Sequence, residues 1–219
     1  MMLSDFEDDY ILDLLFNQLK LFKLTDAEKN IIIDSFSETK SRTEYCFVNT
    51  NNKYYSKNDV AFFNPFHSGQ WCIFLYYLSN TIFISSVDNR TVCDKIYYLN
   101  RMLNSCDLFY EVNLPDIFFL DHPLGTVIGR GIFKNYFSFN QGCTVGNNKG
   151  IFPVFGENVK MLSNTKVLGN STIGDNVIIS ANSYIKDTDI PSGSIVFGTS
   201  PNLIIKKIDA SNYKNYFSK

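Results

Sequence analysis

Hydrophobic residues return every six positions between Phe155 and Ile190. The repeated apolar positions are Phe155, Met161, Val167, Ile173, Ile179 and Ile185. A period of six fits neither the 3.6 residues of an α-helical turn nor the simple alternation of a β-strand. It fits a parallel β-helix of hexapeptide repeats, in which three short faces form one triangular coil. The stretch therefore predicts two stacked coils with the repeated side chains inside.

A second set of smaller or β-branched residues stands four places after the apolar ones: Val159, Thr165, Ser171, Val177 and Ser183. Upstream, Phe133, Phe139 and Val145 keep the step of six, so the solenoid begins before its most regular repeats. Between Val145 and Phe155 the step becomes ten, which predicts that about four extra residues leave the coil as a loop within 146–153. Loops on a rigid scaffold often carry functional sites.

The N-terminal half shows helical periodicity instead. Capping-box sequences at residues 4–7 (Ser-Asp-Phe-Glu) and 25–28 (Thr-Asp-Ala-Glu) predict two helix starts, the second helix ending near residue 39. Apolar residues at helical spacing return over 67–78 and 88–104. The Asn- and Tyr-rich sequence between 43 and 65 predicts a loop or small hairpin. The predicted fold class is mostly β with α: a helical N-terminal domain over 1–105, a parallel β-helix domain over 106–205 and a C-terminal tail over 206–219.

Composition excludes several classes of protein. A hydrophobic content of 45% excludes a disordered chain, and a net charge of -2 argues against nucleic-acid binding. No apolar run reaches the length of a membrane span, and the first twenty residues are too acidic for a signal peptide. The five cysteines follow no metal-ligand spacing. We therefore expect reduced thiols in a cytoplasmic protein, with no metal site.

The chain has two histidines, His67 and His122, so a histidine base must be one of them. His122 lies at the start of the predicted solenoid, and Asp107 precedes it by fifteen residues, somewhat less than one coil. A carboxylate on the adjacent coil would orient the imidazole and stabilise the imidazolium during general-base catalysis. The alternative is that His122 only caps a turn. We interpret His67, in apolar helical sequence, and Cys143, in an inward slot, as structural residues.

These residues carry a family resemblance. The segment 107–206 resembles the catalytic domain of the serine acetyltransferases, hexapeptide-repeat enzymes of the left-handed β-helix type. That family has an Asp fifteen residues before the His of a Leu-Asp-His-Ala-Thr-Gly motif, with another Gly seven residues after the His. The matching residues are Asp107, Leu120, Asp121, His122, Gly125 and Gly129. Residues 141–146 (Gln-Gly-Cys-Thr-Val-Gly) and 66–70 (Phe-His-Ser-Gly-Gln) match two further family motifs. The left-handed winding rests on the resemblance, because crossover rules alone favour a right-handed coil.

The resemblance implies roles for individual residues. His122 becomes the general base, Asp107 its partner, and Asp121 a residue that helps to hold the acceptor. Acetyl-CoA is the implied co-substrate, with its pantetheine arm in a groove along the coils. The implied groove residues are Gly146, Asn147, Ser163 and Ala181. Lys206 would meet the coenzyme A phosphates, unless it is part of a solvated tail. The family builds its sites between subunits of a trimer, so a homotrimer is implied.

One departure from the family concerns the acceptor. The family's loop ends in Arg-His-Pro, where the Arg helps to bind the serine carboxylate, whereas here the aligned residues are Ile151, Phe152 and Pro153. An isoleucine cannot bind a carboxylate in bidentate fashion, and Phe152 offers an apolar or stacking wall. The sequence therefore favours O-acetyl transfer to a hydroxyl of a small molecule, a sugar or saccharide. The alternatives are a serine O-acetyltransferase with other carboxylate ligands and a non-catalytic β-helix scaffold.

Overall fold

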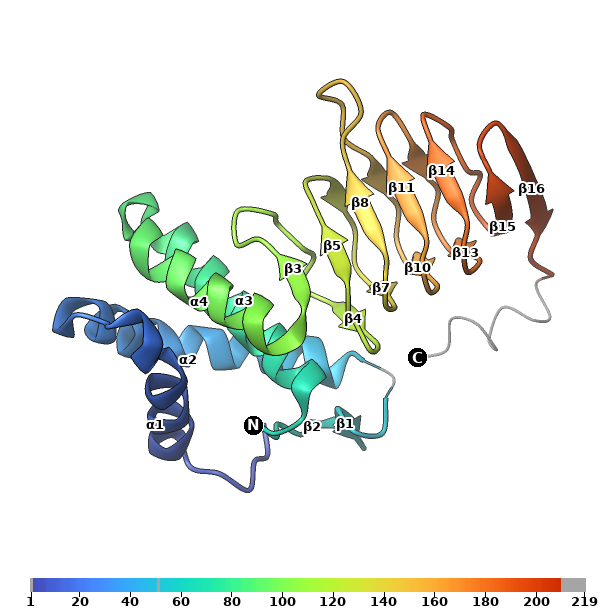
Figure 1. Cartoon of the computed structure of the whole chain (residues 1–219). Helices are drawn as coiled ribbons and strands as arrows, with labels where there is room; N and C mark the ends of the chain where they lie inside the picture. Colours follow the sequence, from blue (N-terminus) through green and yellow to red (C-terminus); the bar gives the residue numbers. More distant parts are fainter. Residues whose placement is uncertain (1, 51, 210–219) are drawn as a thin grey trace. The chain divides into compact units, whose positions relative to one another are not determined.

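The chain forms two compact units in a computed structural model that describes residues 2–50 and 52–209 (Figure 1). One unit contains Met1–Asn104 and Leu108–Glu111, and the other contains Ser105–Asp107 and the chain from Val112 onward. The first unit is helical and the second is a parallel β-solenoid. The predicted fold class, a helical N-terminal part followed by a parallel β-helix, is confirmed.

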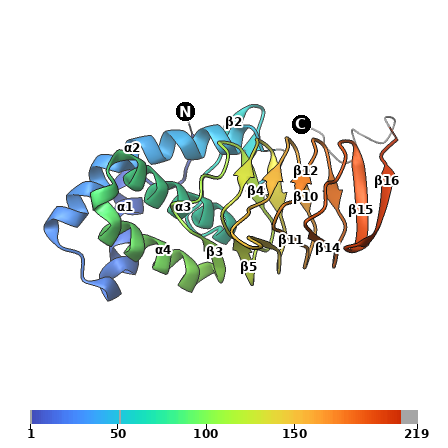
Figure 2. The same ribbon diagram turned by 90° about the horizontal axis from the view of Figure 1, so that it is seen from above.

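The helical unit is built around α3. Its elements are α1 (Asp8–Leu19), the 3-10 turn η1 (Lys20–Phe22), α2 (Asp26–Val48), the hairpin strands β1 (Ser56–Lys57) and β2 (Val60–Ala61), α3 (Ser68–Ser85), the 3-10 turn η2 (Val87–Asn89) and α4 (Arg90–Asn104). Helix α3 is apolar around most of its circumference and is buried from Gly69 to Asn80. Such a helix must lie in a core, and Figure 2 shows α3 between α2 and α4.

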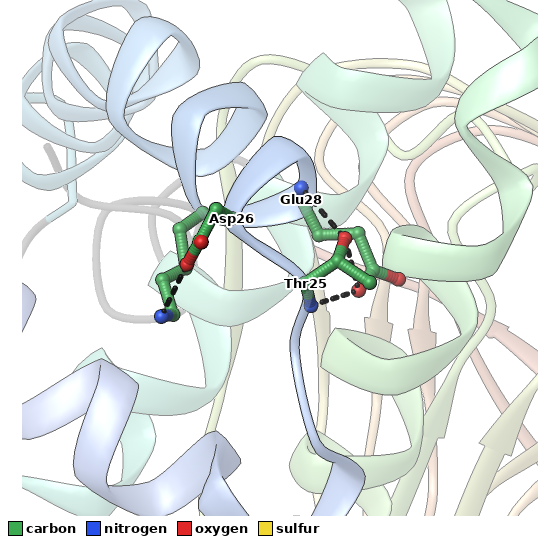
Figure 3. Close-up of polar contacts among 4 residues, drawn as sticks. Thr25, Asp26 and Glu28 are labelled. Carbon is green, nitrogen blue, oxygen red and sulfur yellow. Dashed lines mark hydrogen bonds and ion pairs between the residues drawn. The ribbon is translucent and has the colours of Figure 1, made fainter.

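The capping box at Thr25 is confirmed, as Figure 3 shows. The hydroxyl of Thr25 accepts a hydrogen bond from the Glu28 amide at 3.2 Å, and Glu28 Oε2 accepts one from the Thr25 amide at 2.7 Å. Helix α2 then continues to Val48, beyond the predicted end near residue 39, because Cys46 and Phe47 still face the core.

The capping box predicted at Ser4 is wrong. Helix α1 begins at Asp8, after Glu7 and without a side-chain cap, and the Ser4 hydroxyl accepts instead from the Phe6 amide. The reason is tertiary: Leu3 exchanges backbone hydrogen bonds with Ala61 and Phe63, which holds this segment extended. Long-range pairing therefore overrides the local helix signal.

The solenoid has three faces of parallel strands. One face contains β4 (Phe118–Leu120), β7 (Phe137–Phe139), β10 (Lys160–Met161), β13 (Ile178–Ile179) and β15 (Ser194–Thr199). The second contains β3 (Cys106–Leu108), β5 (Thr126–Ile128), β8 (Thr144–Gly146), β11 (Lys166–Leu168) and β14 (Tyr184–Lys186). The third contains β6 (Ile132–Phe133), β9 (Val154–Phe155) and β12 (Thr172–Ile173).

The six-residue register predicts the core correctly. The six repeated apolar side chains from Phe155 to Ile185 are each at most 1% exposed. Residues of successive coils lie side by side, for example Val167 beside Ile185 and Phe155 beside Ile173. The smaller second set is buried as well, and its hydroxyls find partners, as Ser171 Oγ does on the Leu168 carbonyl at 2.9 Å.

The interruption of the repeat is a loop, as predicted. Strand β8 ends at Gly146 and β9 begins at Val154, whereas β11 and β12 of the next coil are separated only by residues 169–171. Figure 1 shows this loop rising from the end of β8.

The first residues of the tail predicted over 206–219 form a β-strand. Lys206 and Lys207 belong to β16 (Asn202–Lys207), which pairs antiparallel with β15 along its whole length. The strand forms because the chain turns back at Ser200 and Pro201 and hydrogen-bonds to the last solenoid strand, which would otherwise be an open edge. Residues 210–219 of the predicted tail lie outside the described residues.

Candidate active site

His122 occupies the corner between β4 and β5 and points its side chain into solvent. Its backbone is left-handed, with φ +47°, and its side chain is 84% exposed. The corner is fixed on both sides, because the Asp121 amide donates to the Phe139 carbonyl at 3.0 Å and the Gly125 amide donates to the Ser105 carbonyl at 2.8 Å. A non-glycine residue in the left-handed region costs on the order of 1 kcal/mol, and Asn164 and Asn182 adopt the same conformation at corners of later coils.

Asp121 lies beside the imidazole. Its Oδ1 is 3.6 Å from His122 Nε2, and its Oδ2 accepts a hydrogen bond from Asn140 Nδ2 at 3.4 Å. Asn140 was not singled out in the sequence, although it stands one coil, 19 residues, after Asp121. The Asp121 carboxylate therefore lies between an amide that orients it and the imidazole that it can orient.

Asp107 lies on β3, half-buried, and β3 is the neighbour of β5 in the same sheet. Because β5 follows the His122 corner directly, Asp107 and His122 belong to adjacent coils, as the sequence predicted. The partnership of the two side chains stays a prediction.

Two of the predicted coenzyme A residues share an edge of the solenoid with His122. We call this the histidine edge, formed by the corners 121–125, 140–143, 162–165 and 180–183. The corners are stacked by backbone hydrogen bonds, such as the Asn182 amide on the Ser163 carbonyl at 2.9 Å. Asn164 and Asn182 hold the left-handed turns of the edge, each with φ +62°. Ser163 is half-buried and Ala181 is exposed on this edge.

The remaining predicted binding residues lie elsewhere. Gly146 and Asn147 stand where the loop leaves β8, at a second edge that we call the loop edge (residues 146–153 with 169–171 and 187–189). Strands β5, β8, β11 and β14 separate the two edges, and Lys206 lies on β16. One chain therefore does not bring Gly146, Asn147, Ser163, Ala181 and Lys206 into a single groove.

The loop itself is a tight hairpin. Asn148 and Ile151 exchange two backbone hydrogen bonds of 3.0 Å, and the two residues between them, Lys149 and Gly150, both have positive φ. These are the features of a type I′ turn, which forms well-defined two-residue hairpins. The hairpin leaves Ile151 49% exposed and Phe152 37% exposed.

The other candidate side chains have structural surroundings. His67 is the N-cap of α3, where its Nδ1 accepts from the Gln70 amide at 3.3 Å, and its ring lies edge-on to Tyr55. Cys143 is fully buried, and its sulfur lies 3.3 Å from the Thr165 hydroxyl inside the solenoid. Within residues 2–50 and 52–209, no group of three or more His, Cys, Asp and Glu side chains is arranged to hold a metal ion. No helix in those ranges has the length and apolar character that crossing a bilayer requires.

Comparison with protein families identifies the repeat. Residues 152–187 match the family model described as bacterial transferase hexapeptide (six repeats). These residues cover the stretch in which the sequence has its regular six-residue period.

Curated relatives match about half of the chain. A serine acetyltransferase of Synechococcus elongatus is 35% identical over 106 residues, which are 46% of this chain and 43% of the relative. A serine acetyltransferase of Buchnera aphidicola is 36% identical over 121 residues, 52% of this chain and 45% of the relative. The chain thus spans about half the length of the curated relatives it matches. Both relatives are named for serine as their acceptor, and neither is named for a sugar.

The fold also has solved counterparts. The structure described as serine acetyltransferase in complex with CoA superimposes with a TM-score of 0.67 at 18% identity, covering 90% of this chain and 83% of that one. At this identity the likeness concerns the fold alone. Residues 152–187 therefore carry the bacterial transferase hexapeptide repeat, and the chain has the fold of solved serine acetyltransferases.

Proposed function

We propose that the chain is an acetyl-CoA-dependent O-acetyltransferase that acts on the hydroxyl of serine. The observation that carries the proposal is the position of His122, an exposed imidazole on a left-handed corner of the hexapeptide solenoid with the Asp121 carboxylate 3.6 Å away. The similarity to serine acetyltransferases supports the choice of co-substrate and of acceptor.

The proposed reaction is direct transfer. His122 accepts the hydroxyl proton while the hydroxyl oxygen attacks the thioester carbonyl carbon. The carbon–sulfur bond then breaks and the acetyl ester is released. The thiolate of coenzyme A takes up the proton that the imidazolium carries. Asp121 and Asp107 stabilise the imidazolium, and backbone amides near Gly146 stabilise the oxyanion.

Assembly completes the proposed site. Each chain carries the histidine edge and the loop edge on opposite sides of the β5–β8–β11–β14 face, so neither edge alone contains all the binding residues. We propose a homotrimer, in which the histidine edge of one copy faces the loop edge of the next. Such a shared site would bring His122, Ser163 and Ala181 to residues 147–153, which we call the acceptor loop.

A second candidate acceptor, a sugar hydroxyl, is favoured by one observation. Ile151 and Phe152, the exposed residues at the end of the loop, offer no positive charge for a carboxylate, and Lys149, the cation of the loop, lies at the hairpin tip instead. Losing a hydrogen bond to a charged group costs about 1.5–3 kcal/mol, or roughly ten- to a hundred-fold in affinity. A serine enzyme of this type must therefore hold the carboxylate with other residues.

The experiment that tests the proposal is an acceptor panel. Consumption of acetyl-CoA is followed with L-serine, with mono- and oligosaccharides, and with no acceptor, and the products are identified by mass spectrometry. The proposal expects O-acetylserine as the main product. Acetylation of a saccharide in preference to serine would support the second candidate, and no turnover with any acceptor would support a non-catalytic scaffold.

A further inference from the structure

We infer that Asp187 is a positioning residue that holds the acceptor loop 147–153 in its hairpin shape. Asp187 follows β14, two coils away from the loop, and no sequence motif marks it. The inference rests on the proposed function, because the shape of the loop matters for catalysis only if the loop meets the acceptor.

Both oxygens of the Asp187 carboxylate accept a hydrogen bond, one from the loop and one from the coil between. Oδ2 accepts a hydrogen bond from Asn148 Nδ2 at 2.6 Å, and Oδ1 accepts one from the Asn170 amide of the intervening coil at 2.9 Å. Hydrogen bonds to a charged acceptor are shorter and about twice as strong as neutral ones. Asp187 thus ties the loop to the next two coils of the solenoid.

The intervening coil leaves room for this contact only because Gly169 has no side chain. A Cβ at Gly169 would lie 2.1 Å from Asp187 Oδ1 and 2.6 Å from the Asn148 Cβ. Gly169 also has φ +69°, which disfavours any larger residue, and its amide donates to the Gly146 carbonyl at 3.0 Å. Asn148, Gly169 and Asp187 therefore form one arrangement across three coils.

Fixing Asn148 also fixes the exposed end of the loop. The backbone of Asn148 exchanges both of its hydrogen bonds with Ile151, and Phe152 follows directly. If Asn148 loses its anchor, the hairpin moves as a unit with Ile151 and Phe152. Asp187 acts through Asn148 on the wall that meets the acceptor, and it does not touch the reacting atoms itself.

The test exchanges the side chains of Asn148 and Asp187 in the full-length protein. Asn148→Asp alone places two carboxylates against each other and should release the loop. In the double variant Asn148→Asp/Asp187→Asn, the new amide at position 187 donates to the carboxylate at position 148, and its oxygen still accepts from the Asn170 amide. The double variant should therefore restore the anchor.

Two measurements test the inference, the rate of proteolysis at the loop and the KM for the acceptor. Trypsin cleavage after Lys149, an exposed residue at the hairpin tip, reports loop opening without reference to activity. We expect Asn148→Asp to accelerate this cleavage about tenfold and to raise the KM for the acceptor by a similar factor, with kcat changed less. The exchange variant should return both values to within about twofold of the wild type.

Asp175→Ala is the matched control. The Asp175 carboxylate also accepts an amide of the preceding coil, that of Glu157 at 2.7 Å, but at an edge without the loop. It should leave cleavage after Lys149 and the acceptor KM unchanged. Equal cleavage of wild type and Asn148→Asp would overturn the inference, and so would faster cleavage without a change in acceptor KM. If the wild type acetylates no acceptor, the proposed function fails, and the cleavage rates alone decide whether Asp187 holds the loop.

Discussion

At the scale of single residues, the candidate site depends on a few side chains held by unusual backbone. His122 is left-handed and exposed, and its corner is fixed by hydrogen bonds to Phe139 and Ser105 rather than by burial of the ring. An imidazole in this setting contributes little to the core. Its exposure next to the Asp121 carboxylate agrees with the chemical role proposed for it, in which Asp121 and Asp107 would act through the imidazole.

The partnership of Asp107 with His122 predicts non-additive losses. His122→Ala should lower kcat by about 10²–10⁴-fold, the usual contribution of a positioned general base. Asp107→Asn should lower kcat by loosening the same imidazole, and the double variant should be no slower than His122→Ala alone. Steady-state kinetics of the three variants measures this.

Asp175→Asn is the matched control for that cycle. Asp175 lies outside both the histidine edge and the loop edge and accepts the Glu157 amide through Oδ1, which the variant retains, so activity should stay at the wild-type level. Strictly additive losses in the double variant would show that Asp107 acts independently of His122.

The sequence predicts some of these residues and not others. Spacing and motif single out His122, Asp121 and Asp107 as candidates and place them on adjacent coils, because a regular coil converts sequence separation into position, while their catalytic roles stay predictions. The Asn148–Asp187 contact spans 39 residues and depends on the missing side chain of Gly169. No local pattern records such a three-coil arrangement.

At the scale of elements, the six-residue repeat determines the solenoid core. Ile173 is 1% exposed on β12 and lies between Phe155 and Ile190 of the neighbouring coils. Thr172, the preceding residue of the same strand, faces solvent. The two positions differ in little except the direction of the side chain.

Ile173→Asn should therefore destabilise the protein, whereas Thr172→Asn should not. The buried change loses apolar contact and buries an amide, at a cost of about 2–5 kcal/mol in the free energy of unfolding. The exposed change should stay within about 0.5 kcal/mol. Denaturant unfolding of both variants measures the difference, and equal stabilities would contradict the assigned register.

The start of α2 gives a pH-dependent prediction. Burial alone would raise the pKa of the Glu28 carboxyl, but hydrogen bonds from Lys95 and from the Thr25 amide outweigh burial and lower this pKa below its ordinary value. A lowered folded-state pKa means that the stabilisation is complete above the unfolded-state pKa and is lost as the pH falls through the folded-state pKa.

Glu28→Gln should remove this pH dependence. At pH 7 the variant should be less stable than the wild type by about 1–2 kcal/mol, because the ion pair to Lys95 is largely buried, and the difference should shrink toward pH 3. Urea unfolding at both pH values measures it. Asp26→Asn, at an exposed ion pair with Lys29, should change little at either pH. A difference that grows on acidification would contradict the assignment.

Sequence patterns succeed at element scale where the local signal and the tertiary contacts agree. The capping box at Thr25 is formed, and its Glu28 also meets Lys95 on α4. The same pattern at Ser4 fails, because pairing of Leu3 with the β2 region holds the chain extended. The difference lies in contacts that are distant in sequence and therefore invisible to a four-residue pattern.

At the scale of the whole molecule, the proposed site needs more than one copy of the chain. Light scattering should give about three times the 25.1 kDa mass of one chain, or a multiple of that. The acceptor KM and the acetyl-CoA KM should both rise on dilution below the concentration at which the trimer dissociates. A monomer with full acetyl-transfer activity would contradict the shared site.

The central claim is that His122 of the solenoid, rather than His67 of the helical unit, removes the acceptor proton. The most direct measurement is the rate of O-acetylserine formation by folded His122→Ala and His67→Ala, compared with the wild type. We predict that His122→Ala loses about 10²–10⁴-fold in kcat while His67→Ala, which removes the N-cap of α3, loses stability but retains turnover. Near-normal turnover by His122→Ala together with an inactive, folded His67→Ala would contradict the account.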